Sequence, residues 1–211
     1  MNGRKKKHIR FILEYTVSFA VLFLLIYLGF ILNHRSFIWF YDGNKQHFPV
    51  LLYLRDYYLK VAGNLFSGHF TLPMFDFSIG MGEDILTTLN FYGMGDPLTL
   101  LSVFVPKQHM EMFYDFLVAF RMYLAGLTFI FYCRNRGKGR AVSLAGAWLY
   151  VFSGYVLHVA VKHPFFISPM ILLPLMLTGV DRYREKKRSG LLIFLLTIQK
   201  CSYIIARLVR C

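Results

Sequence analysis

The chain has 211 residues, 56% of them hydrophobic, and its formal net charge at pH 7 is +13. On a soluble protein so much positive charge would indicate a nucleic-acid partner. Here, however, most Lys and Arg gather in three clusters beside long apolar runs, without the interleaved aromatic residues of a nucleic-acid groove. These properties exclude a nucleic-acid-binding protein and indicate a membrane protein.

The order of the basic clusters predicts how the chain is oriented in the membrane. They lie at residues 4–10, 134–140 and 182–188, which is every second gap between the apolar runs. The segment 33–111 instead holds seven acidic residues and five Lys or Arg. Because cytoplasmic flanks of membrane helices carry the excess of Lys and Arg, we expect a cytoplasmic N-terminus and an outer segment 33–111.

The first apolar run covers residues 11–32, directly after a basic start. It is long enough to cross a hydrocarbon core of about 30 Å. It is also longer than the apolar part of a signal peptide, and no small-residue cleavage site follows it. We therefore expect an uncleaved transmembrane helix.

A group of polar residues follows this first span within ten positions, so it is expected close to the outer membrane surface. It contains Asp42, Gln46 and His47. The Asp42 carboxylate could accept a proton from an acceptor hydroxyl, or Asp42 and His47 could help to hold a divalent cation against a lipid-linked phosphate. Alternatively, Asp42 or Asn44 caps the start of the next helix.

The rest of the outer loop is too long to be a structureless connector. A helical pattern from Pro49 to Ala62 predicts an amphipathic helix at the membrane surface. Two Gly-Met-Gly turns follow, at 80–82 and 93–95, and each leads into an acidic residue. Residues 98–105 are apolar but too short to span, which favours an interfacial or re-entrant segment.

Three further stretches approach the length of a span, at residues 112–133, 141–161 and 164–180, and a fifth run at 190–199 is partial. The predicted fold is therefore all-α: a polytopic membrane helix bundle of four to five transmembrane helices with a long outer loop. Arg121 lies near mid-depth of the second span, where an Arg is costly. It could face an anionic headgroup, pair with Glu14, or pair with a helix outside this chain.

The end of the chain differs from the rest. Residues 197–211 break an apolar run where a span should be completed. This pattern indicates a chain truncated or frameshifted after about Leu196. A short amphipathic end helix is the alternative.

Together, these motifs resemble the bacterial YfhO membrane-protein family over about residues 10–196. The motifs that carry the resemblance are Asp42-Gly43-x-x-Gln46-His47-x-Pro49, Gly80-x-Gly82-x-Asp84, Asn90-Phe91-Tyr92 with Asp96-Pro97, Leu124-Ala125-Gly126-Leu127, Ser143-Leu144-Ala145-Gly146-Ala147, Tyr150-x-Phe152-Ser153-Gly154-Tyr155 and Leu173-Pro174-Leu175. Where members commonly show Gly-Asp before the Gln, this chain has Tyr41-Asp42-Gly43.

The resemblance implies a function. Members of that family are much longer and look like GT-C type glycosyltransferases, which take a sugar from undecaprenyl phosphate at the outer face of the bacterial cytoplasmic membrane. Their acceptor is lipoteichoic acid or a related envelope polymer. An essential acidic residue lies in the first outer loop of such enzymes, and Asp42 occupies that position, with Asp84 and Asp96 as second choices.

Gln46, His47, Asn90 and Tyr92, which stand in the motifs of the resemblance, are the expected substrate-binding residues. Arg121 is added to them because of its position in the second span and because a guanidinium suits phosphate geometry. Two other functions stay open at this point. One is a transporter or flippase component, in which Arg121 lines a path for an anionic lipid headgroup. The other is an inactive truncated remnant.

Overall fold

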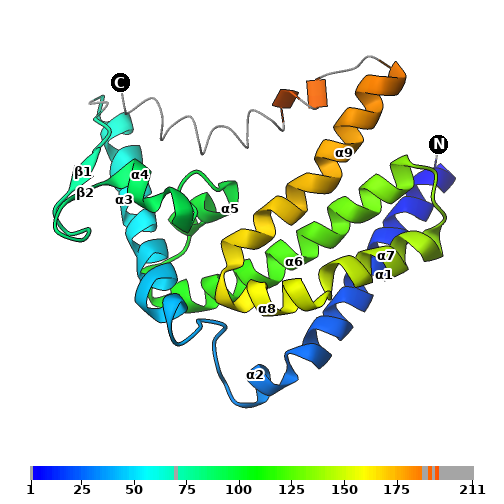
Figure 1. The fold of residues 1–211 in the computed structure, drawn as a ribbon, viewed down its shortest axis with the longest axis horizontal. Helices are drawn as coiled ribbons and strands as arrows, with labels where there is room; N and C mark the ends of the chain where they lie inside the picture. The colour runs from blue at the N-terminus through cyan, green and yellow to red at the C-terminus, as the bar shows by residue number, and fades with distance from the viewer. Residues whose placement is uncertain (1, 69–70, 187–189, 192, 195–211) are drawn as a thin grey trace. The chain divides into compact units, whose positions relative to one another are not determined.

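The computed structural model describes residues 2–68, 71–186, 190–191 and 193–194. In chain order the α-helices are α1 (Asn2–Ile26), α2 (Leu28–Leu32), α3 (Phe48–Phe66), α4 (Ile85–Leu89), α5 (Pro97–Leu100), α6 (Met110–Asn135), α7 (Arg140–Val151), α8 (Gly154–Lys162) and α9 (Ser168–Lys186), as Figure 1 shows. The predicted all-α fold is confirmed. The tail at 197–211 and most of the run at 190–199 lie outside the described residues.

Shorter elements complete the described part. A π-helix, Gly43–His47, precedes α3, and 3-10 helices cover Asn90–Tyr92, Leu101–Phe104, Lys107–His109 and Pro164–Ile167. Two short strands, β1 (Phe75–Asp76) and β2 (Glu83–Asp84), pair antiparallel with Phe75 opposite Asp84. The hydropathy pattern did not predict them.

Three helical segments in the described residues are long and apolar enough to cross a membrane: Ile9–Ile26, Lys107–Asn135 and Pro164–Glu185. A fourth crossing is possible if α7 and α8 act as one span, although they are bent by 49° at their junction. The predicted stretch 141–161 is thus two helices rather than one. The bend has a local cause, because the Ser153 hydroxyl accepts a hydrogen bond from the Val156 amide and so starts a new helix.

The chain divides into two compact units. The first comprises Met1–Phe37 and Asp115–Leu192, and is called the span unit below. The second comprises Ile38–Tyr114 with the described residues 193 and 194. Its portion 38–114 is called the loop unit.

Within the span unit, α1 packs closely on α6. The buried Tyr15 donates a hydrogen bond of 2.9 Å to the backbone oxygen of Tyr123. This approach depends on Gly126, since a Cβ at that position would lie 2.1 Å from the Tyr15 hydroxyl oxygen. At the other side of α1, Glu14 pairs with Arg10 and Arg140. Pairing with Glu14 was one of three alternatives for Arg121, and the structure gives Glu14 these two partners instead.

The loop unit has its own apolar core. The predicted amphipathic helix is α3, and its buried side chains Leu54 and Tyr57 pack with residues that follow it in the chain. Those partners are Ile85, Leu86, Leu89 and Met94. Full burial of a large aliphatic side chain contributes about 1.5–3 kcal/mol to the stability of the fold. The cluster therefore holds α3 and the segment 85–94 together, and with them the polar residues that these segments carry.

Candidate functional site

A tight turn leads into the polar residues of the loop unit. The Asn44 amide donates to the Trp39 oxygen over 2.8 Å, a five-residue step that starts the π-helix. Gly43 makes this turn possible, because a Cβ there would lie 3.1 Å from both the Ile38 carbonyl carbon and the Trp39 Cβ. The Gly in the Asp42-Gly43 motif therefore has a packing reason.

Asp42 occupies the position before this π-helix and is half-buried. Its side chain makes no capping hydrogen bond, so the structure does not support the capping alternative for Asp42. Asn44 lies inside the π-helix. Among the described residues, the Asp42 carboxylate has no hydrogen bond or ion pair. Its acceptor capacity is therefore available to an incoming group.

The two second-choice acids have conformational partners. Asp84 accepts a hydrogen bond of 2.6 Å from the Thr87 amide and caps α4. Asp96 accepts one of 2.9 Å from the Leu98 amide and caps α5. Capping bonds of this kind contribute about 1 kcal/mol to stability. Both acids thus cap a helix, which Asp42 does not.

Three of the predicted substrate-binding residues come together. The Tyr92 hydroxyl donates a hydrogen bond of 2.7 Å to Gln46 Oε1. The His47 and Tyr92 ring centroids are 5.7 Å apart, and His47 is buried. Asn90 is half-buried at the start of the 3-10 helix that carries Tyr92. The two motifs therefore form one polar cluster, and we call Gln46, His47 and Tyr92 the Gln46 cluster.

The side chains of this site provide few ligands for a metal ion. Within the residues that the structure describes, no three His, Cys, Asp or Glu side chains form a group suited to holding one. A single carboxylate such as Asp42 would suit an ion that takes most of its ligands from phosphate and water, as Mg²⁺ does, whereas the imidazole of His47 is a poor ligand for that ion. The divalent metal stays a prediction.

Arg121 lies in the span unit on α6 and is 1% exposed. Its guanidinium carbon is 5.4 Å from the centroid of the Phe165 ring, a cation–π contact that offsets part of the cost of burying the charge. Nearby on the same helix, Asp115 Oδ1 accepts hydrogen bonds from the Ser36 hydroxyl and the Phe37 amide, each 2.8 Å long. Binding of a phosphate by Arg121 stays a prediction.

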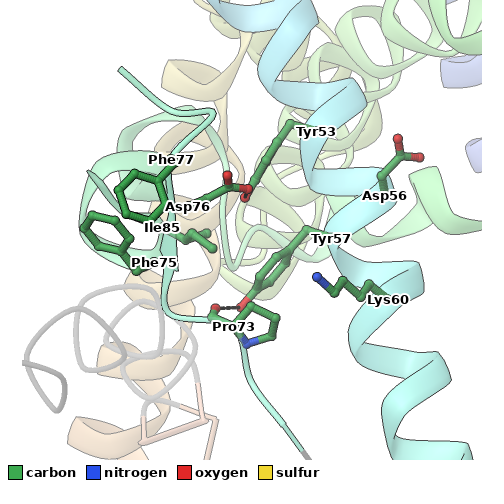
Figure 2. A pocket seen from close by; sticks show the side chains of 9 residues that line it. All are labelled: Tyr53, Asp56, Tyr57, Lys60, Pro73, Phe75, Asp76, Phe77 and Ile85. Atoms are coloured by element: carbon green, nitrogen blue, oxygen red, sulfur yellow. Dashed lines mark hydrogen bonds between the residues drawn. The ribbon is translucent and has the colours of Figure 1, made fainter. Parts of the chain in front are cut away.

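The loop unit also contains a cavity that the sequence did not predict. It has a volume of about 500 Å³ and is lined by Tyr53, Asp56, Tyr57, Lys60, Pro73, Phe75, Asp76, Phe77 and Ile85. Figure 2 shows the two Phe rings on one side and the two charged side chains of α3 on the other, with the two Tyr rings between them. We call it the α3 cavity. It shares no residue with the Gln46 cluster.

Hydrogen bonds and burial shift the pKa values of the polar groups that line this cavity. The Tyr53 hydroxyl donates a hydrogen bond of 2.6 Å to Asp76, which lowers the pKa of the Asp76 carboxyl, while burial raises the pKa of Tyr53. The hydrogen bond from Lys107 lowers the pKa of Asp56. Both carboxyl groups are therefore charged at neutral pH.

One sequence signal could have pointed to this cavity. Phe75-Asp76-Phe77 places two large apolar rings around an acid just before the first Gly-Met-Gly turn. The structure shows why the turn matters. Gly82 has φ +108°, and a Cβ there would lie 2.9 Å from Phe75 Cζ and 3.2 Å from Phe77 Cδ1.

The fold and the loop unit define an α-helical membrane protein of several spans with a structured polar segment between the first two. The chain matches the family described as bacterial membrane protein YfhO over residues 15–199, and it belongs to that family. No curated protein and no solved structure matches it.

Proposed function

We propose that the chain is part of a membrane glycosyltransferase that moves a sugar from undecaprenyl phosphate to a cell-envelope polymer such as lipoteichoic acid. The reaction would take place at the outer face of the bacterial cytoplasmic membrane, with the N-terminus in the cytoplasm. The alternating basic clusters support this orientation. Membership of the YfhO family supports a membrane protein that acts among lipids.

The observation that carries the proposal is the state of Asp42. Three acidic residues in the described part of the chain lack both a hydrogen bond and an ion pair: Asp42, Glu111 and Glu185. Glu111 and Glu185 are exposed, whereas Asp42 is half-buried. A general base must have room to accept a proton from its substrate. Asp42 meets this requirement better than Asp84 or Asp96, because both of these are engaged in caps.

The chemistry balances with Asp42 as the base. The acceptor hydroxyl oxygen forms a bond to the anomeric carbon, and the bond between that carbon and the phosphate oxygen breaks. The hydroxyl proton passes to the Asp42 carboxylate, and polyprenyl phosphate leaves with the bonding electron pair. The Gln46 cluster, next along the chain, offers an amide and a phenol that can hold the acceptor by hydrogen bonds.

The proposal is tested by transfer of a radiolabelled sugar from undecaprenyl phosphate in membranes that contain the chain or a longer family member. Asp42→Asn keeps the shape of the side chain but removes the base, so transfer should fall by at least about 100-fold. Glu111→Gln is the matched control, since Glu111 is an exposed acid of the same unit without a partner among the described residues.

Membrane abundance of each variant is measured in parallel by immunoblot. Full transfer by Asp42→Asn would remove Asp42 from the mechanism. If reconstituted vesicles move the lipid-linked sugar across the bilayer without consuming it, the transporter alternative replaces the proposal.

A further inference from the structure

We propose that the α3 cavity binds a neutral pyranose ring and so provides a sugar subsite separate from Asp42. The inference deepens the proposed function and rests on it, because a sugar-transferring protein must hold a glycosyl unit.

Two exposed aromatic rings line one edge of the cavity. Phe75 is 54% exposed and Phe77 is 82% exposed, and their centroids lie 5.1 Å apart with the rings at 77°. Figure 2 shows both rings at the same edge of the cavity. An aromatic face suits the apolar C–H face of a sugar ring, because both surfaces gain by leaving water.

Hydrogen-bonding groups also line the cavity. Lys60 makes no hydrogen bond or ion pair with any residue that the structure describes, so its ammonium offers three donors. Asp76 Oδ2 accepts from Tyr53 and keeps a further lone pair. A hydroxyl group both donates and accepts, so a polyhydroxylated ring can satisfy the ammonium and the carboxylate at once.

The charged side chains of the cavity favour a ligand without net charge. An anion such as a glycerol phosphate would be attracted by the Lys60 ammonium but repelled by the Asp76 carboxylate, whose charge offsets that of Lys60. A quaternary ammonium suits an aromatic cage, but it would meet the Lys60 ammonium. Asp56 adds little attraction for a cation, because Arg55 and Lys107 already pair with it. A neutral ligand is left as the class that fits.

The shape of the cavity wall depends on a glycine turn. Phe75 and Asp76 stand on β1, which pairs with β2 through the turn that contains Gly82. Because the two Phe rings lie against the backbone of Gly82, a side chain there would displace them. The turn in the Gly80-x-Gly82-x-Asp84 motif therefore holds the aromatic edge of the cavity in place. A volume of about 500 Å³ lies within the usual range for small-ligand sites.

The test measures binding of methyl β-D-glucopyranoside to the full chain in lipid nanodiscs, by saturation-transfer NMR titration. We expect saturation transfer to the glucoside, and no transfer to choline or glycerol 1-phosphate. Phe77→Ala and Lys60→Met should each weaken glucoside binding by at least about tenfold. Phe66→Ala is the matched control, because Phe66 is 89% exposed at the end of α3 and does not line the cavity.

Two variants on different elements keep the test decisive, since Phe77→Ala alters the turn region whereas Lys60→Met alters only α3. Absence of glucoside binding, or binding that neither variant changes, would overturn the inference. Phe77-dependent binding of choline would assign the cavity to a cation instead. Sugar binding in a chain that transfers no sugar would keep the subsite and remove the proposed enzyme, so the two failures are distinguishable.

Discussion

The Tyr92 hydroxyl donates its hydrogen bond to the Gln46 side chain across 46 positions of sequence. It thereby joins the polar motif after the first span to the motif between the two Gly-Met-Gly turns. Gln46 follows Asp42 by four positions in the chain, so removal of the bond should affect the proposed reaction more than the fold.

Tyr92→Phe tests this relationship. The change removes one hydroxyl and leaves Gln46 without that donor. A hydrogen bond between neutral groups typically contributes about 0.5–1.5 kcal/mol of free energy. Sugar transfer should therefore fall by about two- to tenfold in the assay described for Asp42. Tyr41→Phe is the control, because Tyr41 is 56% exposed and its ring contacts are with Trp39 and Phe40. Equal transfer by the two variants would show that the bond has no part in the reaction.

Gly126→Ala tests the close packing of α1 on α6. The new Cβ would lie 2.1 Å from the Tyr15 hydroxyl oxygen and 2.8 Å from Val151 Cγ2. Overpacking of this kind costs about 1–3 kcal/mol, and each kcal/mol lowers the melting temperature by about 2–4 °C in a chain of this size. The measurement is thermal unfolding in detergent. Gly29→Ala, where nothing lies within 4 Å of the added Cβ, should melt no lower than the wild type. A Gly126→Ala chain as stable as the wild type would contradict the packing.

Gly82→Ala and Gly68→Ala separate backbone strain from a clash. Both positions have positive φ, which costs a non-glycine residue about 1–2 kcal/mol. A Cβ at Gly82 also meets the Phe75 ring, whereas nothing lies within 4 Å at Gly68. Hydrogen exchange of the Ile85 amide, which donates to the Met74 oxygen over 2.8 Å, reports on the β1–β2 region. We expect at least about tenfold faster exchange in Gly82→Ala than in Gly68→Ala. Similar rates would mean that the rings do not depend on this glycine.

Asp56→Asn tests the charged contacts that join α3 to the 3-10 helix Lys107–His109. The Lys107 hydrogen bond lowers the pKa of Asp56 in the folded state. A lowered carboxyl pKa stabilises the fold above the unfolded value of about 3.9, and this contribution is lost as the pH falls through the folded pKa. The melting temperature of Asp56→Asn should therefore lie below wild type at pH 7 and converge with it toward pH 3.

The effect should be small, under about 1 kcal/mol, because the Asp56 side chain is 45% exposed. It should also shrink in high salt. Glu111→Gln is the control, since its partnerless acid should give no such convergence. An Asp56→Asn chain that stays below wild type by the same margin at pH 3 would rule out the ion pair as the cause.

The spans could be predicted because hydropathy and charge act over whole segments. The stretch 112–133 was predicted from apolar length alone, and α6 runs Met110–Asn135. The break between α7 and α8 was harder, because it depends on one hydroxyl. Ser153 is compatible with a continuous membrane helix, but its backbone is extended in the structure and its hydroxyl accepts from the Val156 amide, so a new helix starts there.

The sequence indicates candidate polar residues but not the contacts between them. Asp42, Gln46 and Tyr92 stand out by residue type and position, yet their partners depend on the folded chain. The sequence ranks Asp42 before Asp84 by position alone and does not show how their surroundings differ. The structure separates them, because Asp84 accepts the Thr87 amide whereas Asp42 accepts no hydrogen bond among the described residues. The α3 cavity depends on the pairing of Phe75 with Asp84, which no local pattern encodes.

The account depends most on which side of the membrane Asp42 faces. The direct measurement is labelling of Asp42→Cys in intact cells with a membrane-impermeant maleimide, in a chain whose Cys133, Cys201 and Cys211 are alanine. We expect Asp42→Cys to react in intact cells, and a Lys138→Cys control to react only after permeabilisation. Reaction of Asp42→Cys solely after permeabilisation would contradict a sugar transfer at the outer face.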